Sequence, residues 1–176
     1  VIEFQEERYP EAALFAEKTV SLLPDSSGLR GRAYLLWGQS LSRSSAHGKA
    51  AEKLAAALQD AASTDKPEIY FALAMSEMKI GQLADAERHF KSIPTDHERA
   101  AATVRQLAII AIETHQEDRA RFWIEKGKND YPDEFIDSWG SYGLLQVALA
   151  KGDLSTARGL LAESQKQFPP SDPWLI

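Results

Sequence analysis

The chain of 176 residues contains no cysteine. It therefore has no disulfide bond, no thiolate ligand for zinc and no thiol nucleophile, although this absence suits oxidising and reducing compartments equally well. No apolar run approaches the roughly 20 residues that a membrane-spanning helix needs. We therefore expect no membrane insertion by this segment.

Clusters of like charge are also missing. The formal net charge is -6 at pH 7, with 20 Lys and Arg against 26 Asp and Glu, and no five like charges follow one another. Binding to a phosphate backbone depends on clustered Lys and Arg that displace counterions. The sequence therefore predicts no nucleic-acid partner.

Motifs for catalysis and cofactor binding are absent as well. There is no Gly-x-Gly-x-x-Gly or Gly-Lys-Ser/Thr phosphate loop, and the serines within residues 40–45 are not part of a Gly-x-Ser-x-Gly elbow. Four histidines stand without a second ligand at the spacing of a known metal motif: His47, His89, His97 and His115. We expect no catalytic residue, no metal and no cofactor.

Residues 69–90 have the pattern of one complete helix-turn-helix unit. Apolar residues recur at three- and four-residue steps in both halves, as they do on one face of a helix. Gly81 separates the two halves. The rest of the chain resembles imperfect copies of this unit, which predicts an all-α fold of repeated helix pairs.

A small residue in the second helix of each unit sets the register of the repeat. It recurs at spacings of 38, 36, 34 and 37 residues, at Ala12, Ala50, Ala86, Ala120 and Ala157. Twelve residues after three of these alanines comes a proline, where a helix must end: Pro24, Pro132 and Pro169. Gly81 and Gly152 precede second helices, and glycine allows the left-handed conformation that ends a helix. We expect Ala86, Ala120 and Ala157 to be buried where the two helices of their units cross.

The periodicity predicts ten helices, over residues 1–5, 10–22, 28–44, 49–62, 67–80, 83–92, 96–114, 117–129, 134–150 and 154–167. We expect one solenoid domain over 1–176, with a partial repeat 1–24, repeats at about 25–62, 63–98, 99–133 and 134–169, and the start of another at 170–176. Apolar residues near both ends are unlike the polar caps of a complete array: Ile2, Phe4, Trp174 and Leu175. This indicates a segment of a longer solenoid.

The pattern resembles the tetratricopeptide repeat (TPR) family. Its unit is two antiparallel helices in 34 residues, with small residues at positions 8 and 20, a bulky residue at 24 and proline at 32. The match covers nearly the whole chain, although Ala62 replaces one proline and Pro94 comes early, which should shorten the helix before it. Spacings above 34 also suit other helical-repeat families. The resemblance implies an α-solenoid of antiparallel helix pairs, wound as a right-handed superhelix.

In the TPR family the first helix of each unit lines the concave face, where partners bind. Carrying those positions over gives Leu35, Gln39, Arg43, Phe71, Met75, Arg105, Ile109, Trp139, Tyr142 and Gln146. Aromatic residues, Met and Arg are enriched at the centres of protein interfaces. The resemblance therefore implies a non-enzymatic scaffold that binds another protein or a peptide. The alternative for Met75, Ile109 and Leu149, another residue of this face, is that they are inter-helix core.

Two narrower expectations concern charge on this face. Some family members hold the C-terminal carboxylate of chaperones with Lys and Asn, and this clamp is absent here because the matching position holds Leu35, Phe71, Arg105 and Tyr142. Basic residues along one wall could instead receive an acidic peptide or be solvated: Arg32, Arg43, Lys79 and Arg105.

A rival function comes from bacterial envelope proteins that export exopolysaccharide and contain similar arrays. Trp139 and Tyr142 would then stack on sugars, making polysaccharide a second partner class. This comparison slightly favours a periplasmic or envelope location over the cytoplasm. A third alternative is self-association through the ends of the solenoid.

Overall fold

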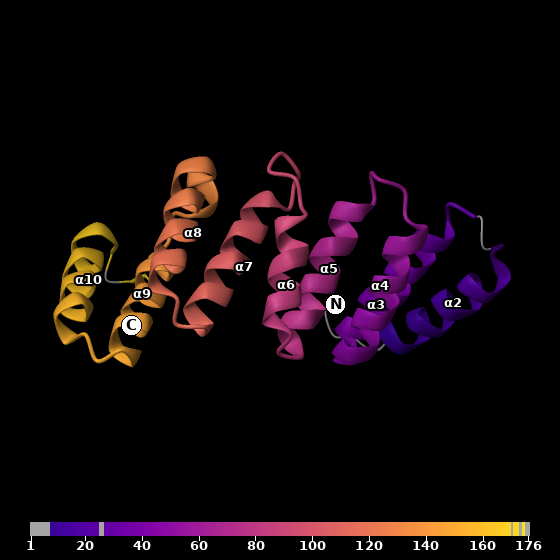
Figure 1. Ribbon diagram of the computed structural model, residues 1–176, viewed down its shortest axis with the longest axis horizontal. Coiled ribbons are helices and arrows are strands. Elements are labelled where there is room, and N and C mark those ends of the chain that lie inside the picture. The colour runs from indigo at the N-terminus through magenta and orange to yellow at the C-terminus, as the bar shows by residue number, and fades with distance from the viewer. Residues whose placement is uncertain (1–7, 25–26, 170, 173, 175–176) are drawn as a thin grey trace. The chain divides into compact units, whose positions relative to one another are not determined.

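The computed structural model describes residues 8–24, 27–169, 171–172 and 174. The described part is helical and contains no strand, which confirms the prediction of an all-α fold (Figure 1). The helices are α2 (Tyr9–Leu22), α3 (Arg30–Arg43), α4 (His47–Asp60), α5 (Lys66–Lys79), α6 (Leu83–Lys91), α7 (Ala100–Glu113), α8 (Glu117–Asp130), α9 (Trp139–Ala150) and α10 (Leu154–Gln167), with a 3-10 turn, η1 (Pro132–Glu134). The helix expected at 1–5, and Ile2, Phe4 and Leu175, lie outside the described residues.

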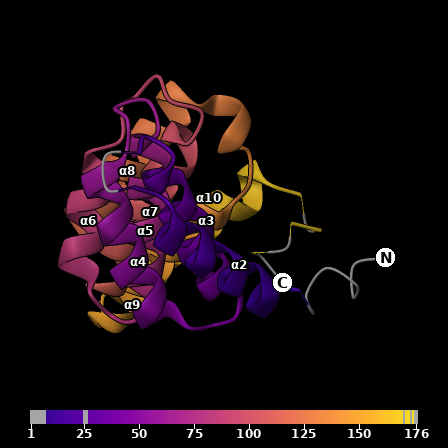
Figure 2. The same ribbon diagram turned by 90° about the vertical axis from the view of Figure 1, so that its right-hand side faces the viewer.

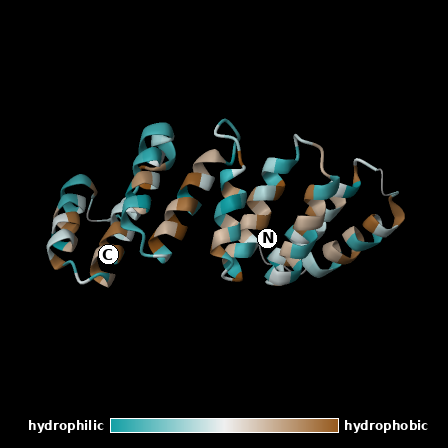
Figure 3. Cartoon of the chain, in the orientation of Figure 1, coloured by the Kyte–Doolittle hydropathy of each residue, from teal (hydrophilic) through white to brown (hydrophobic). Residues whose placement is uncertain are grey.

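The chain divides into two compact units, Val1–Arg99 and Ala100–Ile176. The predicted repeat boundary after residue 98 lies next to this division. Most helices carry both apolar and polar residues, as expected for helices that bury one side (Figure 3).

Unit 1 is built from the helix pairs α3–α4 and α5–α6. Helix α2 packs against α3, as Figure 2 also shows, and α4 packs against α5. Its largest fully buried side chains are Leu54, Ile69, Leu73 and Phe90. On the surface, the Lys53 ammonium lies 4.3 Å from the centre of the Trp37 ring.

Unit 2 is built from the helix pairs α7–α8 and α9–α10. Its core includes Val104, Ala120, Ile124, Phe135 and Trp139. The Phe135 ring lies over Gly127, where a Cβ atom would come within 2.3 Å of it. Glycine at position 127 therefore makes room for an aromatic side chain from the loop between α8 and α9.

The repeat register accounts for burial in four units. Ala50, Ala86 and Ala120 are completely buried and Ala157 is 4% exposed. The first unit differs, because Ala12 is exposed and the neighbouring Ala13 and Ala16 are buried instead. The prolines expected to end helices each stand two residues beyond the end of one. Helices α2, α8 and α10 end at Leu22, Asp130 and Gln167, and Pro24, Pro132 and Pro169 follow.

The turns inside the four helix pairs share one backbone geometry. Each contains a residue with positive φ, and the next residue donates its N–H to a carbonyl five residues earlier, at 2.8–2.9 Å. This is the Schellman arrangement, which satisfies carbonyls at the helix end. The left-handed residues are Ser45 (φ 60), Gly81 (φ 79), His115 (φ 55) and Gly152 (φ 74). The expectation for the two glycines is confirmed, and two residues with side chains adopt the same conformation.

Two predicted helix starts are wrong. Helix α7 begins at Ala100 rather than residue 96, because a turn in which the His97 N–H bonds to the Pro94 carbonyl precedes it. Helix α9 begins at Trp139 rather than residue 134, because the chain first forms η1 and then inserts Phe135 into the core. The expected shortening before Pro94 is confirmed, since α6 ends at Lys91.

Candidate functional site

Unit 1 contains a groove that follows helix α3, formed by two adjoining hollows. The first has a volume of about 550 Å³ and lies between α2, α3 and α5. The second, of about 490 Å³, is lined by the beginning of α3 and by residues that precede α5 and α7. Leu36, Glu68 and Arg99 line both hollows. We call the two together the α3 groove.

The five partner-binding residues predicted for unit 1 all line the α3 groove: Leu35, Gln39, Arg43, Phe71 and Met75. They come from α3 and α5, the first helices of two successive pairs. Residues three or four apart share a helix face, which is why this sequence spacing brings them to one surface.

The apolar wall of the groove comes from Leu36, Phe71 and Met75. Leu36 is 60% exposed. Phe71 is half-buried, and its ring meets the Phe90 ring edge to face at 5.7 Å. The Arg99 guanidinium lies 5.2 Å from the Phe71 ring centre. The aromatic side chain is therefore held in place while part of it faces the groove.

Two ion pairs flank the second hollow. Arg99 donates two hydrogen bonds to the Glu68 carboxylate, at 2.8 and 3.0 Å, and Arg32 donates two to Asp65, at 2.7 and 3.1 Å. The hydrogen bond from Arg32 is the main reason that the pKa of Asp65 lies below its usual value. These charges compensate one another, so Arg32 is not available as a free cation of a basic wall.

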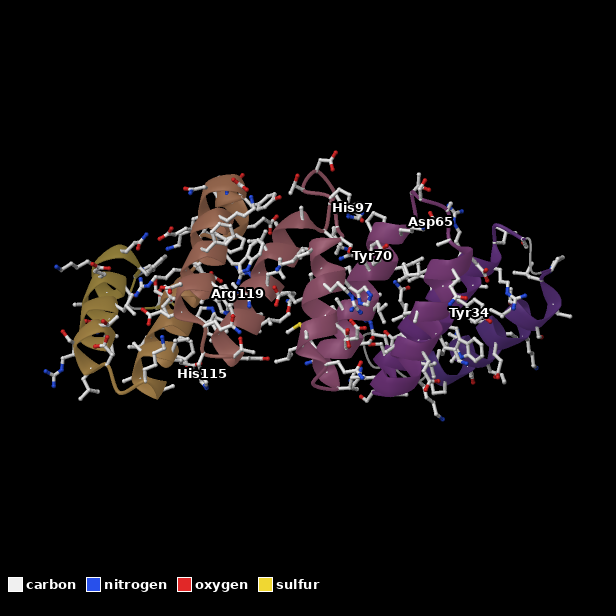
Figure 4. All side chains as sticks on the ribbon, viewed as in Figure 1. Tyr34, Asp65, Tyr70, His97, His115 and Arg119 are labelled. Carbon is white, nitrogen blue, oxygen red and sulfur yellow. The ribbon has the colours of Figure 1, made fainter. Side chains whose placement is uncertain are left out.

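The backbone before α7 completes this end of the groove. The Arg99 N–H donates to His97 Nδ1 at 3.2 Å. Asp65 and His97 both lie near the ends of their connecting segments in unit 1 (Figure 4). Glu98, also part of the lining, is exposed.

The opposite end of the groove is basic. The Arg43 guanidinium lies 3.4 Å from the Tyr9 hydroxyl, to which it donates, and 5.8 Å from the centre of that ring. Within the described residues, Arg43 forms no ion pair with a carboxylate. This end therefore combines a cation with a phenol at the mouth of the groove.

In unit 2 the guanidinium group of Arg105, a predicted partner-binding residue, is occupied by contacts within the protein. Its guanidinium lies 5.1 Å from the Phe135 ring centre and 4.8 Å from that of Trp139. It donates to the Glu134 carbonyl at 2.7 Å and pairs with Asp137 at 3.4 Å. Arg105 thus fastens the segment before α9 to α7.

The other predicted residues of unit 2 also contact their own unit. Trp139 is only 8% exposed and belongs to the core, because the segment that carries Phe135 packs beside it. Ile109 packs against the same core. Tyr142 is 36% exposed, but its ring lies 5.7 Å from that of Trp174, and its hydroxyl accepts a 2.8 Å hydrogen bond from Gln146. Trp139 and Tyr142 therefore do not present two exposed faces for stacking on sugars.

Several groove residues were not identified from the sequence, among them Tyr9, Leu36, Glu98 and Arg99. The one available signal was spacing, because Arg99 follows its partner Glu68 by 31 residues and Asp65 follows Arg32 by 33 residues. Both intervals are close to the repeat length, which places the partners on neighbouring repeats.

A largely buried polar contact joins α5 to α6. His89 Nδ1 lies 2.8 Å from Glu77 Oε2, and the side chains are 16% and 8% exposed. The Tyr70 ring, labelled in Figure 4, stacks on the His89 ring at 5.9 Å. Burial is the largest influence on Glu77 and raises the pKa of its carboxyl group. This pair links the helix that carries Phe71 to its partner helix.

Metal and membrane features are missing from the part of the chain that the structure describes. These residues contain no group of three or more His, Cys, Asp and Glu side chains able to hold a metal ion. Within the same part of the chain, no helix has both the length and the apolar character that crossing a bilayer requires.

No protein-family model and no curated protein matches this sequence. Solved structures do match. The TPR-like repeats of a putative kinesin light chain from Podosopora anserina superpose with a TM-score of 0.69 at 16% identity, over 92% of this chain and 88% of that one, and a variant of the same repeats gives the same score and identity. BtubC (BKLC) from P. vanneervenii gives 0.65 at 18% identity, over 92% of this chain and 74% of that one. The chain therefore has the TPR-like helical-repeat fold, in the α-solenoid class.

Proposed function

We propose that this protein is a non-enzymatic scaffold that binds another protein or a peptide in the α3 groove. The main support is that five side chains predicted from repeat positions line one open groove, together with the exposed Leu36. The TPR-like fold agrees with this proposal, because repeat arrays offer extended concave surfaces for binding.

The lining has the chemistry of a protein interface. Phe71, Met75 and Arg43 belong to the residue types enriched where interfaces derive most of their binding energy. Gln39 and Ser40 add amide and hydroxyl groups that can bond to the backbone of a bound segment. A bound segment with an apolar side chain between polar groups would match this lining.

The nearest approach to a catalytic pair near the groove is Ser42 with His47, whose Oγ and Nδ1 atoms are 3.4 Å apart. In a catalytic triad a third group orients the imidazole through its other nitrogen. Within the described residues no hydrogen bond to that nitrogen of His47 occurs. We therefore include the absence of catalysis in the proposal.

The test compares two leucines of equal exposure. Leu36 lies in the groove and Leu29 precedes α3 outside it, and both are 60% exposed. A partner is captured from the source organism with the wild-type chain and purified, and its Kd is measured against Leu36→Glu and Leu29→Glu. Burying an unpaired carboxylate in an apolar contact should cost ~2 kcal/mol, or roughly thirtyfold in Kd.

Circular dichroism of both variants should show wild-type helix content, since each substitution replaces an exposed side chain. We expect Leu29→Glu to bind like the wild type. Unchanged binding by Leu36→Glu, or equal loss in both variants, would place the interface elsewhere.

A further inference from the structure

Charge is distributed unevenly along the α3 groove. At the end where α3 terminates, Arg43 donates a hydrogen bond to Tyr9 and forms no ion pair with a carboxylate among the described residues. At the other end, the Arg32–Asp65 and Arg99–Glu68 pairs are internally compensated. Glu98 adds a carboxylate that forms no ion pair with a described residue, although its charge also acts on the adjacent Arg99. The lining is therefore positive at one end and negative at the other.

The length of the groove sets the spacing of matching charges on a ligand. Helix α3 lines it from Arg32 to Arg43. At 1.5 Å per residue this stretch is about 16 Å long. An extended chain advances about 3.3 Å per residue, so about five residues cover the same distance.

The shape of the groove, two hollows in a row along α3, suits an extended chain. The two hollows measure about 550 and 490 Å³ and share part of their lining. An extended segment is narrower than a helix and lets alternate side chains enter the groove.

We propose that the α3 groove binds an extended peptide segment in one direction, with a basic residue beside Glu98, an apolar residue against Leu36 and Phe71, and an acidic residue beside Arg43. The basic and acidic residues lie about five positions apart. This proposal rests on the proposed function, because it specifies the partner of the same groove. Complementary charge fixes the direction, since reversal places like charges together at both ends.

The test uses two synthetic peptides of identical composition with blocked termini. One contains Lys, four intervening residues of which two are Leu, and Glu; the other has the reverse order. Fluorescence anisotropy measures Kd for each at low salt. We expect the forward peptide to bind about tenfold more tightly. Each exposed charge pair contributes little by itself, but on reversal the attraction at both ends becomes repulsion. The preference should shrink in 1 M salt, where charges are screened within about 3 Å.

Exchanging the charges of the protein should exchange the preference. The double variant Arg43→Glu, Glu98→Lys keeps the net charge and should prefer the reversed peptide. As a control, Lys49→Glu with Glu52→Lys makes the same exchange on α4, outside the groove, and should leave the preference unchanged.

Several results would overturn the proposal. They are equal affinity for the two peptides, no binding of either at millimolar concentration, or a preference that survives the Arg43 and Glu98 exchange. Tighter binding of a helical peptide with its charges eleven residues apart would show that the occupant is a helix. The proposed scaffold function would stand after any of these results, because it is tested separately, by the loss of natural-partner binding in the Leu36→Glu variant.

Discussion

Gly152 and Gly159 provide a test of the turn geometry on which the repeat register depends. A Cβ atom added at either position would meet no atom within 4 Å, so an alanine fits sterically at both. The backbone differs, because Gly152 has a φ of +74 at the α9–α10 turn, whereas Gly159 lies inside α10. Any difference between the two alanine variants therefore comes from backbone conformation.

The expected effects have opposite signs. At Gly152 an alanine in the left-handed region costs about 1–2 kcal/mol, offset by about 0.4–1 kcal/mol from the stiffer unfolded chain. Gly152→Ala should thus lose roughly 0.5–1 kcal/mol. Gly159→Ala should gain about 1 kcal/mol, because alanine favours the helix interior over glycine by that amount.

Thermal unfolding followed by circular dichroism measures both effects. For a chain of this length, 1 kcal/mol shifts Tm by about 2–4 °C, so the two variants should move in opposite directions by a few degrees. Ser45→Gly and His115→Gly should both raise Tm, since they relieve the same left-handed strain in two of the other helix pairs. Destabilisation by both alanines, or a loss of Tm in the glycine variants, would refute this account of the turns.

Three further substitutions test packing and charge. Ala120→Leu should cost about 1–3 kcal/mol, because Ala120 is completely buried; hydrogen exchange should rise in unit 2, and an unchanged Tm would contradict the register. Arg105→Lys should cost about 1–2 kcal/mol in urea unfolding, because an ammonium cannot reproduce the guanidinium contacts with two rings and a backbone carbonyl; wild-type stability would show that the charge alone matters. The raised pKa of Glu77 means that its carboxyl group holds a proton more tightly in the folded protein than in the unfolded chain. The contribution of Glu77 to stability therefore falls as the pH rises above 4.5, the ordinary pKa of a glutamate. Glu77→Gln should remove this dependence, and its unfolding free energy relative to the wild type should increase with pH; a constant difference would contradict the assignment.

The helix pairs and their ends could be predicted because local chemistry determines them. Pro24 restricts φ and lacks a backbone N–H, whereas Gly81 permits a positive φ, and both properties can be read from the sequence alone. Ser45 and His115 carry no such signal, since residues other than glycine are uncommon at positive φ. The late start of α9 was missed for a related reason, because insertion of Phe135 over Gly127 is a tertiary contact that helical periodicity does not encode.

The residues of the candidate site could likewise be predicted only in part from the sequence. Repeat positions sufficed to select Gln39, Phe71 and Met75, because equivalent positions of successive first helices face one side. Burial of Trp139 could not be predicted, since it depends on how the segment before α9 folds. The pairing of Arg99 with Glu68 joins residues 31 positions apart, and only the folded repeat shows that they meet.

The position of Trp37 has a practical consequence for optical experiments. Of the four tryptophans, only Trp37 belongs to unit 1, and the other three lie at 123, 139 and 174 in unit 2. A Trp37→Phe variant would confine indole fluorescence to unit 2, and its difference from the wild type would report on unit 1 alone. Emission recorded during denaturation can therefore show whether the two units melt together or in succession, without any added dye.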